Sequence, residues 1–195
     1  MIKNRLEKLG NVILKTVCSS NNEIIETDEA FSLFKHFIEN TRGNVYVIGN
    51  GGSAGIASHF CNDLIKALKI ASNTLVDSNV LTCLANDYGY ENCFSEALKV
   101  NMKRDDLLVA ISSSGNSKNI INAVNVAKNK KVNVISLSGF LQNNLLRSLG
   151  TLNFWLDACD YGLVEMGHFF LLHTLVDCYK EIQKKSLNEL FVNVQ

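Results

Sequence analysis

The sequence predicts an α/β fold in which a parallel β-sheet is covered by helices on both faces. Short, continuously apolar runs alternate along the chain with longer stretches of helical periodicity. Two of the apolar runs end directly in turns rich in glycine and serine. The apolar fraction of 47% is that of a folded protein with a real core. Strands that alternate with helices imply right-handed crossovers and hence a parallel sheet.

The N-terminal segment, residues 1–42, is predicted to form two helices. Residues 2–18 carry apolar side chains at helical spacing. Thr27 is expected to cap a second amphipathic helix that ends at about Asn40, with acidic residues in its first turn. His36, on this second helix, is interpreted as an ordinary hydrogen-bonded residue. Both helices are too apolar to face solvent alone, so we expect them at a subunit interface.

The central segment, residues 43–160, is predicted to hold the sheet. Five strands suit a doubly wound sheet of the flavodoxin type, whose ligand site lies beyond the carboxyl ends of the strands, where the strand order reverses. The expected elements, in chain order, are strand 45–48, helix 53–69, strand 74–76, helices 79–86 and 91–103, strand 107–111, a helix to about 128, and strands 132–137 and 152–156.

The C-terminal segment, residues 161–195, is predicted to form one long helix from Tyr161 to about Leu187. It is apolar on nearly every side as far as Cys178, so we expect it to pack with the N-terminal helices in an oligomer bundle. The length of 195 residues favours a single domain built from these three segments.

Composition excludes several classes of function. The 19 basic and 19 acidic residues balance to zero net charge, which argues against a nucleic-acid binder because that function needs a basic surface. No long apolar window predicts a membrane span, and the N-terminus does not read as a secretory signal. The 6 cysteines form no CxxC pair and are interpreted as reduced thiols. These features predict a cytoplasmic protein.

Two loops at strand ends carry the pattern of a phosphate site. The first, residues 49–60, places glycines before a helix that Ser53 opens, and the free amides of such a helix start can hold an anion. It is not the dinucleotide fingerprint, because no glycine occupies the third place of GxGxxG. The second loop, residues 112–117, brings more hydroxyls to a helix start than capping needs. Either loop alone is compatible with a capped turn; together they indicate phosphate binding.

Histidine and carboxylate residues recur at helical spacing. His59 and Asp63 are four residues apart, which puts them on one helix face. On the last helix, Glu165 lies three residues before His168 and eight before His173, so Glu165 and His173 can face one cleft. Imidazole and carboxylate ligands suit zinc. Each histidine taken singly is as well explained as a hydrogen-bonded core residue.

The first loop with His59, the pair Asn86-Asp87, and residues 112–117 together resemble the sugar isomerase (SIS) domain of phosphoheptose isomerases. The resemblance covers nearly the whole chain. It implies a cytoplasmic homotetramer with active sites between subunits. The implied reaction converts sedoheptulose 7-phosphate to D-glycero-D-manno-heptose 7-phosphate, the precursor of heptose in lipopolysaccharide or capsule.

The resemblance also implies which residues bind the substrate. Serines of both loops would hold the phosphate, whereas Asn50 and Asp87 would contact the sugar. The implied substrate-binding residues are Asn50, Gly51, Ser53, Asp87, Ser112, Ser113, Ser114 and Ser117.

The family's metal set of histidine, glutamate, glutamine and histidine falls on His59, Asp63, Glu165 and His173, which implies one zinc per subunit. Two of these positions depart from the family. Asp63 is one methylene shorter than the usual glutamate, and Glu165 is a carboxylate where an amide is usual. We expect Glu165 or Asp63 to act as the base and His173 as the acid of an isomerisation through an enediol, with His168 in reserve.

Other interpretations stay open at this point. The chain can isomerise a different ketose phosphate of polysaccharide synthesis, as the shorter Asp63 suggests. It can also be a non-catalytic SIS protein that binds a replication initiator, although the retained histidines and carboxylates argue against this. A sugar-phosphate-sensing regulator usually carries a DNA-binding domain in addition, for which 195 residues leave no room.

Overall fold

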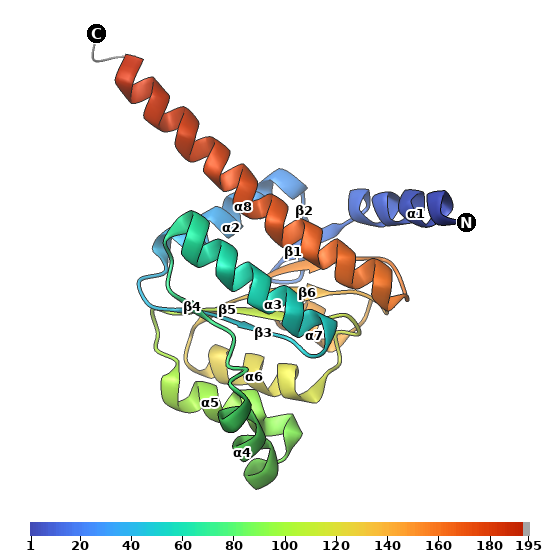
Figure 1. The fold of residues 1–195 in the computed structure, drawn as a ribbon, viewed down its shortest axis with the longest axis vertical. Coiled ribbons are helices and arrows are strands. Elements are labelled where there is room, and N and C mark those ends of the chain that lie inside the picture. The colour runs from blue at the N-terminus through green and yellow to red at the C-terminus, as the bar shows by residue number, and fades with distance from the viewer. Residues whose placement is uncertain (193–195) are drawn as a thin grey trace.

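The structure is a computed structural model that describes residues 1–192, with side-chain surroundings as far as residue 185. Residues 193–195 of the expected C-terminal segment lie outside the described residues. A seven-stranded sheet with the order β2-β1-β7-β6-β5-β3-β4 forms the centre (Figure 1). The predicted doubly wound part is confirmed and consists of five parallel strands: β3 (Val45–Ile48), β4 (Ser72–Asn73), β5 (Leu107–Ser112), β6 (Asn133–Ser138) and β7 (Leu152–Trp155).

The strand order reverses between β3 and β5. From β3 the chain moves outward to β4, then returns to β5 on the other side of β3 and continues to β6 and β7. The two loops with the phosphate pattern follow β3 and β5, which are hydrogen-bonded neighbours. The reversal therefore places both loops side by side, at the position where doubly wound sheets bind ligands.

Helices cover both faces of the sheet (Figure 1). One face is covered by α2 (Thr27–Asn40), α3 (Gly52–Asp63) and α8 (Tyr161–Val192), and the other by α5 (Cys93–Asn101), α6 (Lys118–Asn129) and the short α7 (Leu145–Leu149). Successive residues of a strand point alternately into the hydrophobic core on one face of the sheet and into the core on the other face. Val47 and Val109 pack with the α2–α3–α8 side, whereas Ile48 and Ala110 pack with the α5–α6 side.

The N-terminal segment differs from the prediction. α1 (Ile2–Leu14) ends earlier than expected, and a hairpin of β1 (Val17–Ser20) and β2 (Glu23–Ile25) separates it from α2. β1 pairs antiparallel with β7 and so extends the sheet by two strands. The turn residues Asn21 and Asn22 both have positive φ, 48° and 72°. An Asn-Asn pair accepts that conformation readily, and two such residues make the tight turn that joins antiparallel strands.

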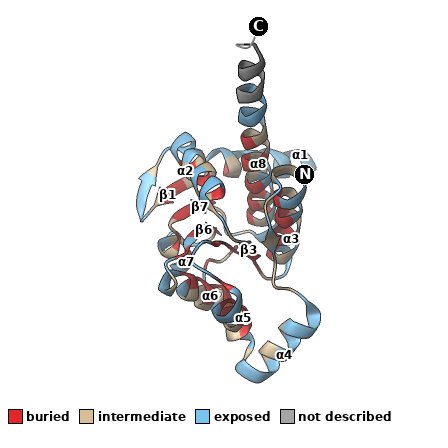
Figure 2. Ribbon diagram, turned by 90° about the vertical axis from the view of Figure 1, so that its left-hand side faces the viewer, coloured by how far each residue is buried: buried red, intermediate tan, exposed pale blue. Residues whose placement is uncertain are grey.

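The helical segment α4 (Ser78–Tyr88) projects from the body of the chain (Figure 2). The structure describes all of its residues, and none of them is buried. A 3₁₀ turn, η2 (Tyr90–Asn92), joins it to α5. The strand expected at 74–76 lies slightly earlier, at β4. The helix expected to run to 69 changes after Asp63 into a wider π-helical turn, Leu64–Leu68, which ends where Lys69 adopts a left-handed conformation.

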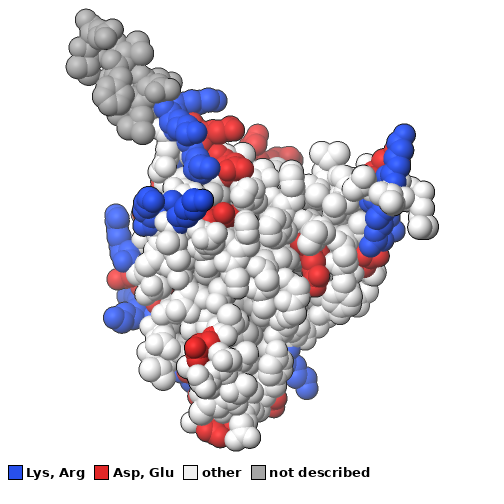
Figure 3. Space-filling view, viewed as in Figure 1, with Lys and Arg blue, Asp and Glu red and all other residues white. Residues whose placement is uncertain are grey.

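Both terminal helices leave the body of the chain. Figure 1 shows α1 running out to one side and the far end of α8 standing clear of the sheet. α1 exposes Ile2, Leu6 and Leu14, and α8 exposes Phe170. Charged side chains of both signs are scattered mainly around the outline of the face in Figure 3, without a basic patch on that face. Among the described residues, no helix is long and apolar enough to span a membrane.

Candidate active site

A cavity of about 260 Å³ opens beyond the ends of β3 and β5. It is built from the two glycine- and serine-rich loops and from the start of α8. We call it the serine cavity; its lining residues are Asn50, Gly51, Gly52, Ser53, Ile111, Ser112, Ser113, Ser114, Ser117, Tyr161 and Glu165. It brings together all the substrate-binding residues expected from the sequence except Asp87.

The first loop lets the backbone and a carboxylate come close together. Gly51 has φ of 53° and ψ of −122°, a conformation that suits glycine because it has no Cβ. At Gly52 a Cβ would overlap the carboxylate of Glu165. Glu165, which is partly buried on α8, therefore lies directly against the N-terminus of α3. A negative charge is favoured there because the first amides of a helix have no partner within it.

The second loop leaves hydroxyl groups available for a ligand. Ser112 Oγ donates to Ser117 Oγ at 3.1 Å, and Ser114 Oγ accepts from the backbone of Asn116 at 3.3 Å. The Ser113 hydroxyl is buried and has no hydrogen-bond partner among the described residues. Ser117 occupies the N-cap of α6, yet its side chain makes no capping hydrogen bond. Hydroxyls and free helix amides can thus meet a phosphate without a basic residue in the lining.

The short helix α7 braces this loop from outside. The backbone N–H of Leu146 donates to the Gly115 carbonyl at 2.9 Å, and that of Leu145 donates to Asn116 Oδ1 at 3.1 Å. The helix α7 was not predicted from the sequence. Its signal was Asn144, an N-cap residue whose side chain accepts from the backbone of Arg147.

A second group of functional side chains lies farther along α3 and α8, and we call it the His–Asp cluster: His59, Asp63 and His173. His173 Nδ1 is 2.8 Å from Asp63 Oδ2, and His59 Nε2 is 3.4 Å from the same oxygen. One ligand atom from each of the three residues lies within 4.8 Å of the other two. His59 and Asp63 therefore lie on one face of α3, as their spacing predicted, and α8 adds His173.

The donor set of the His–Asp cluster fits a zinc ion. Two imidazoles and a carboxylate are typical zinc ligands, and three protein ligands leave one position open. The buried His59 Nε2 has no hydrogen-bond partner among the described residues, as expected of an atom placed to bind a metal. On the other side of its ring, His173 Nε2 lies 3.6 Å from Asp177 Oδ2.

Glu165 does not join this cluster within one chain. It precedes His173 by eight residues, which is about 12 Å along a helix, and it faces the serine cavity instead. Asp87 is also separate. Its carboxylate, on the projecting α4, accepts from Asn86 Nδ2 at 2.9 Å and does not line the cavity.

His168, the reserve candidate, is a core residue. Its side chain is fully buried, and its Nε2 lies 3.0 Å from the carbonyl oxygen of Ser138. Burial lowers the pKa of His168 from its usual value to about 4, because the charged ring would lose its hydration. The ring is therefore neutral at physiological pH, and it does not line the cavity. A role in proton transfer is not compatible with this placement.

Comparison with known proteins agrees with the fold. A model of the SIS domain matches residues 8–139. The chain belongs to this family. A phosphoheptose isomerase from Campylobacter concisus is 33% identical over 187 residues, which cover 93% of this chain and 96% of the relative. A phosphoheptose isomerase from Helicobacter pylori is 31% identical over 183 residues, which cover 91% of this chain and 87% of the relative. The predicted resemblance is therefore confirmed.

Two solved structures of phosphoheptose isomerases share the fold. A phosphoheptose isomerase from Neisseria gonorrhoeae matches with a TM-score of 0.70 at 29% identity, covering 77% of this chain and 85% of that chain. One from Francisella tularensis matches with a TM-score of 0.78 at 22% identity, covering 92% and 96%. The second likeness shows the shared fold only, because its identity is low.

Proposed function

We propose that this chain is a phosphoheptose isomerase. It converts sedoheptulose 7-phosphate to D-glycero-D-manno-heptose 7-phosphate and so supplies heptose for lipopolysaccharide or capsule. The relatives named above support the reaction. The observation that carries the proposal is the serine cavity, in which hydroxyls and two helix N-termini face a carboxylate at the strand-order reversal. The hydroxyls and helix N-termini can bind a phosphate, and the carboxylate can abstract a proton.

The proposed chemistry needs one base, one acid and a firm hold on the phosphate. A base removes a proton from C1 of the ketose, an enediol forms, and the proton is returned to C2 while a second proton moves from O1 to O2. Glu165 is the proposed base, which is supported by its position in the lining of the same cavity as the serines. Asp63 and His173 are the proposed acid–base pair for the oxygens. Binding of the remote phosphate supplies orientation.

We further propose one zinc ion per subunit, held by His59, Asp63 and His173. When bound, it supplies a Lewis acid that stabilises the developing oxyanion. The separation of Glu165 from the His–Asp cluster along α8 supports an active site shared between subunits, in which Glu165 of one chain completes the cluster of another. The exposed apolar residues of α1 and α8 support a homotetramer built through these helices.

We also propose a cytoplasmic location and a single domain. The proposed division is residues 1–42, 43–160 and 161–195. The first segment belongs to the same domain because β1 is hydrogen-bonded to β7 of the central sheet. The free cysteines of the described chain fit a reducing compartment.

The test is proton exchange on sedoheptulose 7-phosphate in deuterated water. We expect deuterium in the recovered sugar together with aldose product, and no exchange with Glu165→Gln. A panel of other ketose phosphates run in parallel separates this substrate from related ones. Absence of both exchange and product with sedoheptulose 7-phosphate would falsify the assignment. If no panel member reacts and purified protein retains no metal, the non-catalytic binding protein becomes the better description.

A further inference from the structure

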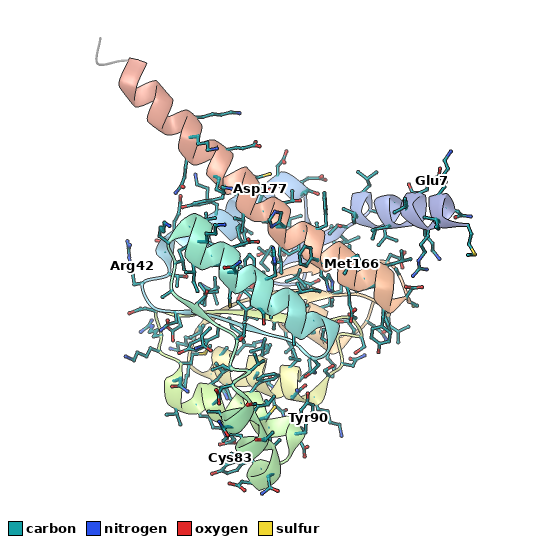
Figure 4. All side chains as sticks on the ribbon, in the orientation of Figure 1. Glu7, Arg42, Cys83, Tyr90, Met166 and Asp177 are labelled. Atoms are coloured by element: carbon teal, nitrogen blue, oxygen red, sulfur yellow. The ribbon has the colours of Figure 1, made fainter. Side chains whose placement is uncertain are left out.

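Asn50, at the edge of the serine cavity, is held by two side chains from other elements. Tyr90 Oη, in η2, donates to Asn50 Oδ1 at 2.8 Å. Asn119 Nδ2, in the first turn of α6, donates to the same oxygen at 2.8 Å, and Asn50 Nδ2 donates back to Asn119 Oδ1 at 2.9 Å. The two amides thus donate to each other, and the Tyr90 phenol adds a hydrogen bond to this pair from the side of α4. Figure 4 shows Tyr90 on the α4–α6 side of the sheet, opposite Asp177 on α8.

The orientation of this pair is set by the backbone. The N–H of Ile120 donates to Asn119 Oδ1 at 3.0 Å. A backbone N–H can only donate, so the Asn119 atom that faces it is the amide oxygen, which shares this N–H with the Ser117 carbonyl at 3.0 Å. The nitrogen of Asn119 then faces Asn50 and requires an oxygen there. Because Asn119 is only 3% exposed, its amide has little access to water as an alternative hydrogen-bond partner.

A count of donors and acceptors shows what Asn50 has left for a ligand. An amide oxygen has two lone pairs, and Tyr90 and Asn119 occupy both. An amide nitrogen has two hydrogens, and Asn119 takes one. The second N–H of Asn50 is therefore the remaining polar group of a side chain that lines the cavity. It can donate a hydrogen bond, but the side chain can no longer accept one.

We propose that Tyr90 and Asn119 are positioning residues that fix Asn50 as a hydrogen-bond donor to an oxygen acceptor of the bound sugar phosphate. The acceptor is a carbonyl, enediolate or phosphate oxygen. The inference rests on the proposed binding of a sugar phosphate in the serine cavity. We call the hydrogen bonds from Tyr90 and Asn119 to Asn50 the Tyr90–Asn119 clamp. Without this clamp, the amide of Asn50 can rotate and turn its oxygen to the ligand, where that oxygen repels the acceptor oxygen of the ligand.

The test is a double-substitution cycle with a matched control. Tyr90→Phe removes one hydroxyl from a residue that is 54% exposed, and Tyr88→Phe makes the same change at a residue that is also 54% exposed. Binding of sedoheptulose 7-phosphate is measured by calorimetry, and KM and kcat are measured where the sugar is turned over. We expect Tyr90→Phe to weaken binding about 3- to 10-fold and Tyr88→Phe to leave it unchanged.

The second arm places Tyr90→Phe in an Asn50→Ala background. If Tyr90 acts through Asn50, its removal has no further effect there, because residues that act through one contact are not additive. Asn119→Ala, checked for an unchanged melting temperature, is expected to weaken binding more than Tyr90→Phe because it releases both amide bonds. An effect of Tyr90→Phe that persists without Asn50, or no effect in the native background, overturns the proposal.

Inorganic phosphate serves as a second probe. If Tyr90→Phe weakens phosphate and sugar phosphate equally, the acceptor is a phosphate oxygen; if it weakens only the sugar phosphate, the acceptor is a sugar oxygen. Either result supports the clamp. If native protein binds sedoheptulose 7-phosphate or fructose 6-phosphate but isomerises neither, the proposed reaction fails and the cycle still decides the inference. If native protein binds no sugar phosphate, both fail.

Discussion

The serine cavity and the His–Asp cluster lie along the same two helices but are built in different ways. α3 and α8 run side by side, so that Gly52 meets Glu165 at one level and His59 meets His173 farther on. The cavity uses neutral hydroxyls, an amide pair and backbone groups, most of them held by neighbours within the chain. The cluster gathers ionisable side chains that approach one another but leave the buried His59 Nε2 without a hydrogen-bond partner among the described residues.

The difference separates binding from chemistry. A site of fixed neutral donors can hold a phosphate at any pH near neutrality. A site of imidazoles and carboxylates can move protons or hold a metal, but it depends on what completes it. Changes to the neutral groups of the cavity are therefore expected to alter KM. Changes to the cluster, or to the cavity carboxylate Glu165, are expected to alter kcat, and changes to the cluster also alter metal content.

The largest effect is expected from His173→Ala. Loss of the proposed acid and metal ligand should lower kcat about 10²- to 10⁴-fold while KM changes little, as steady-state kinetics with zinc analysis will show. His36→Ala, at an exposed histidine on α2, is the control and should behave as the native enzyme. A large rise in KM with unchanged kcat would reverse the division of roles between the two regions.

The pH dependence of stability should reveal His168, which lies on α8 between the two regions. Its pKa is about 4 in the folded chain against an ordinary value of 6.5. Above pH 6.5 the ring is neutral in both states. As the pH falls from 6.5 towards 4, the unfolded chain takes up a proton that the folded chain does not, so up to about 3 kcal/mol of stability is lost.

Urea unfolding of the native protein and of His168→Asn at several pH values in this window measures that loss. The variant should show a shallower fall, because asparagine does not titrate. Parallel pH curves for the two proteins would mean that His168 is not held neutral by burial.

Ser117→Ala should affect binding alone. Its hydroxyl is available to a charged phosphate, and such a hydrogen bond is strong, so KM should rise about 10- to 100-fold with kcat nearly constant. Ser58→Ala, at an exposed serine on α3, provides the control. An equal loss in kcat would show that the Ser117 hydroxyl takes part in the chemical step.

The smallest effect is expected at the edge of the cluster. Asp177 lies 3.6 Å from His173 Nε2 and can orient that ring for a metal on the opposite nitrogen. Asp177→Asn should weaken zinc affinity about tenfold, as measured by competition with a chelator. Glu181→Gln makes the same charge change one turn farther along the exposed part of α8 and should leave the affinity unchanged.

The sequence predicts the parallel sheet and its ligand end well because buried strands leave continuous apolar runs, such as residues 107–111. It misses the hairpin β1–β2, because residues 2–18 also fit a helical period. The Asn21-Asn22 pair was the available signal for a turn.

The site is predicted less evenly. Spacing along a helix correctly predicts that His59 and Asp63 share one face. Spacing does not show which side chains can meet within one chain, so Glu165 was grouped with the His–Asp cluster, although it lies about two helical turns before His173. His168 and His173 look alike in the sequence, but His168 is buried against the Ser138 carbonyl, whereas His173 contacts Asp63. Tyr90 and Asn119 left no recognisable signal, because their importance lies in contacts between elements that are 40 and 69 residues from Asn50.

The hairpin β1–β2 has a consequence for how this protein can be handled. β7 is buried along its whole length, and β1 covers the hydrogen-bonding edge that would otherwise be free. The new outer strand, β2, is only three residues long and begins with the charged Glu23, which makes it a poor template for another chain. Shortened versions that begin at α2 would expose β7 and invite intermolecular strand pairing, so solubility depends on keeping the first 26 residues.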